Sequence, residues 1–99
     1  MRISFRDDEL RRLYEEADLR VPRLGPDVVR TFRKKVGFVE AAHSELDLRN
    51  YRALHFEKLA GNRKGQHSIR LNDQWRLILT IESDPGGRLV VIIEIVDYH

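Results

Sequence analysis

With 99 residues, of which 41% are hydrophobic and 34% charged, the chain is long enough for one globular domain and too short for two. We therefore predict a single domain over residues 1–99. The absence of cysteine excludes disulfides, thiolate chemistry and cysteine-based zinc sites. No stretch approaches the roughly 20 apolar residues of a membrane-spanning helix, and we expect a cytoplasmic protein.

The net charge of +2 hides an uneven distribution. Residues 1–51 are nearly balanced, whereas residues 52–76 carry six basic and two acidic side chains, and residues 77–99 carry one basic and four acidic ones. A basic segment of this kind favours contact with a polyanion, and the alternative is a solvated basic surface.

The first half of the chain predicts one strand and two helices. Residues 2–6 alternate as a short strand, and residues 8–17 place apolar side chains at helical spacing. Prolines and a glycine interrupt the pattern before a longer helix over residues 26–42. Its basic cluster could bind nucleic acid, but we interpret it as the solvated outer face of the helix; the cluster consists of Arg30, Arg33, Lys34 and Lys35. Residues 44–52 have no clear period, and we expect an irregular connection held to the core by Leu46, Leu48 and Tyr51.

The second half predicts four strands, over residues 54–59, 66–71, 74–82 and 89–96. Asn72 and Asp73 favour a tight hairpin turn, and residues 84–87 favour a looser one. The expected fold is therefore α+β, in the order β-α-α-β-β-β-β, with two helices on one face of a mainly antiparallel sheet and the other face open. The last strand is apolar on both faces and should be central.

Two segments carry residues suited to chemistry. The turn that begins at Gly61 holds Arg63 and Lys64, so backbone and cations can approach an anion, although a solvated loop fits the same pattern. The ending Asp97-Tyr98-His99 offers a carboxylate, a phenol and an imidazole for acid/base work. The alternative is that Tyr98 packs and His99 is solvated. The four histidines show no metal-ligand spacing, and we predict no metal site.

The segment GNRKGQHSIRLNDQWR, together with the ending EIVDYH, resembles the HigB-type toxins of bacterial type II toxin–antitoxin systems. These form the plasmid maintenance killer protein family within the RelE/ParE superfamily, and the resemblance extends over nearly the whole chain. It implies a RelE-like fold and a ribosome-dependent endoribonuclease, or mRNA interferase, that cuts mRNA on the 70S ribosome without a metal or cofactor. It also implies a HigA-type helix-turn-helix antitoxin as partner, with DNA contacted only through the antitoxin complex.

The family's active-site ending matches Asp97, Tyr98 and His99, and its Trp-Arg pair matches Trp75 and Arg76. Glu57 stands where the better-studied family members have a histidine. Ala60 stands where they have a basic residue. His55, which we expect on the same strand face as Glu57, and Lys58 are possible substitutes.

RNA cleavage needs no metal if the ribose 2′-hydroxyl attacks the adjacent phosphorus. The protein then supplies a base for the 2′ proton, an acid for the leaving 5′ oxygen, and cations for the phosphoryl charge. We assign His99, oriented by Asp97, to acid/base transfer, Arg76 to the phosphate, and Tyr98 to donation or base stacking. Glu57 or His55 is the complementary base.

The remaining basic side chains are expected to grip RNA phosphates without reading sequence. The RNA-binding candidates are His55, Lys58, Arg63, Lys64 and Arg70. We expect Trp75 in the core, and His43 and His67 as structural or surface residues. Three other functions stay open: a ParE-like toxin that poisons DNA gyrase, a non-catalytic RNA-binding module, and a metal hydrolase, which the scattered histidines disfavour.

Overall fold

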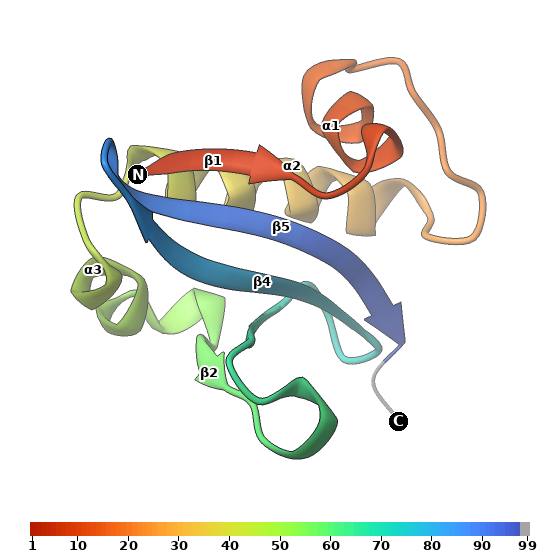
Figure 1. The fold of residues 1–99 in the computed structure, drawn as a ribbon. Helices are drawn as coiled ribbons and strands as arrows, with labels where there is room; N and C mark the ends of the chain where they lie inside the picture. Colours follow the sequence, from red (N-terminus) through yellow and green to blue (C-terminus); the bar gives the residue numbers. More distant parts are fainter. Residues whose placement is uncertain (98–99) are drawn as a thin grey trace.

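A computed structural model describes residues 1–97 as one sheet with helices packed against it (Figure 1). The helices are α1 (Asp8–Glu15), α2 (Pro26–Ala41) and α3 (Glu45–Asn50), with short 3-10 turns η1 (Arg52–Leu54) and η2 (Gly61–Arg63). The strands are β1 (Arg2–Phe5), β2 (Glu57–Lys58), β3 (His67–Arg70), β4 (Trp75–Asp84) and β5 (Gly87–Asp97). Their order in the sheet is β1-β5-β4-β3-β2.

The sheet is mainly antiparallel, as expected, with one parallel pair. β1 pairs with β5 in parallel, and the other neighbours run antiparallel. A parallel neighbour requires a long crossover, and the helices supply part of it before the chain returns through the antiparallel strands. β5 consequently lies between β1 and β4, in the interior position that its apolar run predicted.

The core lies between one face of the sheet and the helices. Its fully buried side chains include Phe32 and Val36 from α2, Leu13 from α1, and Leu77 and Leu79 from β4. Burial of each such side chain contributes roughly 1.5–3 kcal/mol relative to exposure. This face is called the helix face below, and the opposite one the helix-free face.

Local sequence explains where the two long helices begin. The Asp7 side chain accepts a hydrogen bond from the Leu10 N–H and caps α1. α2 begins at Pro26, which lacks an N–H that the first turn would leave unsatisfied. The residue before it, Gly25, has φ of 77°, a conformation that favours glycine.

Arg33 joins the two long helices through hydrogen bonds rather than facing solvent. Its guanidinium donates to the carbonyls of Leu13 and Glu16, each at 2.8 Å, and to that of Leu19 at 3.3 Å. These carbonyls lie at the end of α1 and just beyond it, where intrahelical partners run out. The assignment of Arg33 to a solvated outer face was therefore wrong.

The connection expected over residues 44–52 is instead helix α3 followed by η1. Leu48 is fully buried as expected, whereas Leu46 is 62% exposed and Tyr51 is 36% exposed. The strand expected over residues 54–59 shrinks to the two residues of β2, because η1 occupies its beginning. The turn between β4 and β5 is tight rather than loose, since Asp84 pairs directly with Gly87.

Within residues 1–97, no helix is both long and apolar enough to cross a membrane.

We predict that Arg33→Met lowers the free energy of unfolding by about 2 kcal/mol, because it leaves partly buried carbonyls without a charged donor. Arg30→Met is the matched control, one turn earlier on α2, because the one side-chain partner of Arg30 in the described part of the chain is Asp27, in an exposed ion pair. Urea unfolding of both variants measures the difference. Equal effects of the two substitutions would contradict a special role for Arg33.

Candidate functional site

The candidate site is built on the hairpin formed by β3 and β4. The Asn72 side-chain oxygen accepts hydrogen bonds from the N–H groups of Gln74 at 2.8 Å and Trp75 at 2.7 Å. An asparagine that bonds the backbone two and three residues on stabilises a tight turn. The turn predicted at Asn72 and Asp73 is thereby confirmed.

The two arginines of this hairpin lie side by side. Arg70 and Arg76 are register partners, so their side chains leave the same, helix-free face. Arg76 donates to the Asn72 carbonyl at 2.6 Å, and Arg70 forms an ion pair with Asp73. The turn therefore holds two guanidinium groups close together on rigid strands, an arrangement suited to a phosphate.

The end of β5 lies beside this arginine pair. Val96 is the register partner of Arg76, and Asp97 that of Trp75. The Asp97 carboxylate accepts a hydrogen bond from the Gln74 side-chain amide at 3.0 Å. This bond ties the end of the last strand to the hairpin turn. The predicted roles of Tyr98 and His99 fall outside the described residues and stay predictions.

Arg63 brings the basic turn onto the helix-free face. Its guanidinium donates to the Glu94 carboxylate at 2.7 Å and to the Gln66 side-chain oxygen at 2.9 Å. Ile78, the register partner of Glu94, is only 2% exposed. The helix-free face is thus partly covered, which corrects the expectation of an open face. Lys64 follows Arg63 and is exposed.

The segment that holds Glu57 differs from the prediction. Glu57 pairs with Ser68, and this register places its side chain on the helix-free face with the arginine pair. Lys58 pairs with His67 and belongs to the helix face. His55 lies outside the strand, at φ of 46° after η1, so the shared strand face with Glu57 was wrong.

Cross-strand register defines two neighbouring rows on the helix-free face. One row holds Glu57, Ser68, Ile78 and Glu94, and the next holds Arg70, Arg76 and Val96. With strands about 4.8 Å apart, the Glu57 backbone lies roughly 10 Å from β4. The sheet therefore gathers two carboxylates, in one row, and two guanidinium groups, in the next row, on one face.

Lys35, in α2, lies beside this site and not on the solvated outer face that was predicted for it. Its ammonium donates to the carbonyls of Arg70 at 2.5 Å and Ala53 at 2.7 Å, so α2 holds the end of β3 and η1 together. Burial lowers the pKa of Lys35, and the nearby charges of Arg70, Lys34 and Arg76 lower it further. The sequence signal for this position is the helical spacing of Lys35, three residues after Phe32 and four before Val39, which are both buried.

His67, in β3, is a structural residue, as expected. It is 8% exposed and stacks on Phe56 with ring centroids 4.8 Å apart. Its Nδ1 has no hydrogen-bond partner within residues 1–97. Burial lowers the pKa of His67 despite the opposing charge of Glu45, so the neutral imidazole is favoured. Trp75 is half-buried against the core, also as expected.

Residues 1–97 contain no group of three or more His, Asp or Glu side chains arranged to hold a metal ion. The described part of the candidate site holds cations and carboxylates on the sheet and its turns.

Residues 3–99 match the family model described as RelE-like toxin of type II toxin-antitoxin system HigB. The chain belongs to this HigB-like toxin family. It is 38% identical to Toxin HigB-1 of Vibrio cholerae over 78 residues, which cover 79% of this chain and 81% of that protein. An uncharacterized protein of Haemophilus influenzae is 31% identical over 88 residues, covering 89% and 86% of the two chains.

Solved structures share the fold. A YoeB/ParE toxin from Agrobacterium tumefaciens matches with a TM-score of 0.64 at 13% identity, over 100% of both chains. The YoeB-YefM complex from Staphylococcus aureus matches with a TM-score of 0.53 at 20% identity, over 100% of this chain and 97% of that one. The RelE-like α+β fold expected from the sequence of this HigB-like toxin is confirmed.

We predict that His67 makes the stability of the protein depend on pH. Its pKa is lower in the folded state than the ordinary 6.5, so the unfolded chain takes up the proton first as the pH falls. The free energy of unfolding therefore keeps its full value above about pH 6.5. Below that pH it declines by at most about 1.4 kcal/mol per pH unit, until the pH falls below the folded-state pKa of His67.

Urea unfolding between pH 7.5 and 5 measures this decline, with His67→Phe removing its share while keeping a ring stacked on Phe56. His43→Gln is the control, because His43 is exposed. Identical pH profiles for the wild type and His67→Phe would show that the burial of His67 carries no proton linkage.

Proposed function

We propose that this HigB-like toxin is an endoribonuclease that cleaves mRNA on the 70S ribosome in the cytoplasm, without a metal or cofactor. Membership of a family of type II toxins supports the toxin assignment. The pairing of Arg70 with Arg76 on rigid strands is the observation that favours phosphate chemistry over a merely structural surface.

In the proposed mechanism the ribose 2′-hydroxyl attacks the adjacent phosphorus, and the bond from phosphorus to the 5′ oxygen breaks. Arg76 stabilises the charge that gathers on the phosphoryl oxygens. Glu57 serves as the base that takes the proton of the 2′-hydroxyl. His99, oriented by Asp97, is then the acid that donates a proton to the leaving 5′ oxygen. Tyr98 donates a hydrogen bond or stacks on a base.

The other basic residues contribute affinity. Arg70 and Arg63 share the helix-free face with Arg76, which supports a role for both in contacting phosphates next to the cleaved one. His55, Lys58 and Lys64 lie in short or irregular segments at its edge and would grip the backbone further along the strand. Their contribution should fall with salt and carry no sequence preference.

We expect Arg76→Ala to reduce the rate of mRNA cleavage by about 10²–10³, because it removes a cation from the developing phosphoryl charge. His99→Gln should reduce it by about 10²–10⁴ through loss of proton transfer. Mapping of mRNA 5′ ends on translating ribosomes after induction measures both effects. Arg88→Ala, which removes an exposed cation to which no RNA contact is assigned, is the control.

Growth arrest with intact mRNA in the wild type would contradict the nuclease function. Poisoning of gyrase would then be the next function to test, by assaying DNA supercoiling. RNA binding without cleavage, with toxicity unchanged in His99→Gln, would instead identify a non-catalytic RNA-binding module.

We also propose an antitoxin of the HigA helix-turn-helix type as the partner, and DNA binding only through their complex. The HigB-like family is one of toxin–antitoxin systems, and a solved structural neighbour is the YoeB-YefM complex. A small helix-turn-helix reading frame should lie just downstream of the gene. Its co-expression should restore growth, and its absence would contradict this partner.

A further inference from the structure

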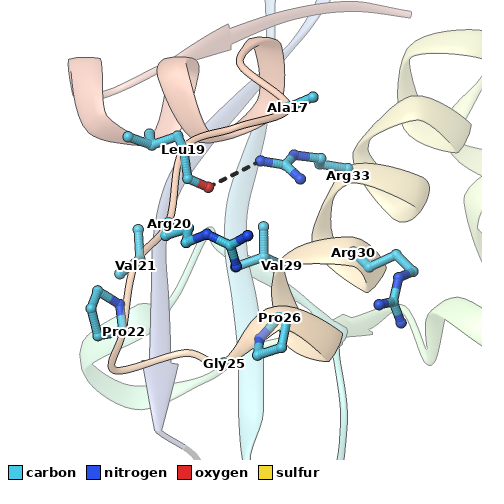
Figure 2. A pocket seen from close by; sticks show the side chains of 10 residues that line it. All are labelled: Ala17, Leu19, Arg20, Val21, Pro22, Gly25, Pro26, Val29, Arg30 and Arg33. Atoms are coloured by element: carbon cyan, nitrogen blue, oxygen red, sulfur yellow. Dashed lines mark hydrogen bonds between the residues drawn. The ribbon is translucent and has the colours of Figure 1, made fainter.

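A hollow separates α2 from the loop that follows α1 (Figure 2). Its volume is about 420 Å³, and we name it the α1–α2 groove. The residues that line it are Ala17, Leu19, Arg20, Val21, Pro22, Gly25, Pro26, Val29, Arg30 and Arg33. The lining is thus mostly apolar, with three arginines and no acidic side chain.

The groove is preformed. Arg33 fixes the loop by donating to the carbonyls of Glu16 and Leu19, and the bond to Leu19 is the dashed line in Figure 2. Leu24 anchors the far end of the loop in the core, at 4% exposure. A partner that binds here does not have to order the loop, so little of its binding free energy is lost to conformational entropy.

The charges of the groove point to an acidic partner. Arg20 makes no ion pair or side-chain hydrogen bond within residues 1–97, and Figure 2 shows it extending from the loop toward α2. Within residues 1–97 the side chain of Arg30 pairs only with Asp27, and both side chains are largely exposed, at 75% and 88%. Such an exposed pair contributes little and can be exchanged for a carboxylate of a partner at low cost.

The apolar lining distinguishes a peptide from RNA as the occupant. Leu19, Val21 and Val29 offer a surface that an apolar side chain can fill, whereas a phosphate chain gains nothing from it. The groove also belongs to the helix layer, while Arg70 and Arg76 project from the opposite face of the sheet. RNA held by the arginine pair therefore has no direct path into the groove.

We propose that the α1–α2 groove binds an acidic, amphipathic segment of the antitoxin, with one apolar side chain in the hollow and carboxylates against Arg20 and Arg30. This inference rests on the proposed toxin–antitoxin pairing and adds the surface and the chemistry of the contact.

Charge reversal provides the first test. Arg20→Glu/Arg30→Glu should weaken the Kd for the polypeptide encoded beside the toxin gene by about 100-fold, because like charges across an interface are strongly unfavourable. The matched control is Arg6→Glu/Arg88→Glu, which changes the net charge equally at two exposed sites outside the groove. The control should change the Kd by less than about threefold at 0.15 M salt, where distant charges are screened.

Filling the hollow provides the second test. Ala17 is exposed at the rim, and Ala17→Trp should weaken binding by about tenfold or more without changing its dependence on salt, since it blocks the apolar contact only. Titration calorimetry measures every variant, and thermal unfolding verifies that each one is folded.

The outcomes separate this inference from the proposed function. Loss of antitoxin binding in both groove variants, with mRNA cleavage retained in its absence, supports the groove. Unchanged binding in both variants, or an equal loss in the control, overturns it while leaving the toxin assignment intact. Weaker RNA binding with normal antitoxin binding would make the groove a nucleic-acid site and overturn it as well.

Failure of wild-type toxin to bind that polypeptide would remove both the partner and the groove assignment, whereas intact mRNA during growth arrest would contradict only the nuclease.

Discussion

The pairing of β4 with β5 is the constraint on which the candidate site depends. The two strands stay in register from Asp84 and Gly87 at the turn to Trp75 and Asp97 at the other end, with one bulge between. A slip of one residue would move every side chain to the opposite face of the sheet. The tight turn and the bulge together therefore determine, about ten residues away, that Asp97 ends beside the row of Arg76.

Two arginines of the site form exposed ion pairs with acidic side chains. Arg63 pairs with Glu94 and Arg70 with Asp73, and in both pairs the side chains are more than a third exposed. Pairs exposed to this extent contribute little to stability, so in the proposed function the exchange of a carboxylate for an RNA phosphate would cost little. The pairs nevertheless orient the guanidinium groups in the absence of a ligand, which would lower the entropy lost on the proposed binding.

Alternation along the sequences of β3 and β4 is enough to place Arg70 and Arg76 opposite the core residues, because strands paired on both sides keep a period of two. Shorter elements were not predictable in the same way. α3 has only six residues, fewer than two helical turns, so its apolar positions cannot establish a period. The failure at His55 has a similar cause, since a left-handed residue after η1 removed the first part of an expected strand.

The cations of α2 show a second limit of sequence reasoning. Arg33 and Lys35 have the composition of a solvated helix face, yet both donate to backbone carbonyls of other segments. Which carbonyls lie within reach depends on the packing of α1, η1 and β3 against α2, and no local pattern encodes that packing. Helix position gives the direction of a side chain, and only the tertiary fold supplies its acceptor.

A third feature that the sequence could not predict is which side chains of β5 face the helices and which face away from them. Val90 and Ile92 face the helices, and strict alternation would direct Glu94 into the core after them. A bulge at Ile93 shifts the phase, because Glu94 pairs with Ile78 while Ile92 pairs with Leu79. The carboxylate of Glu94 consequently reaches Arg63 on the helix-free face, and the next residue, Ile95, returns to the core. In an apolar run such as LVVIIEIV both phases satisfy burial, so the choice is made by the partner strand and by the cost of burying a charge.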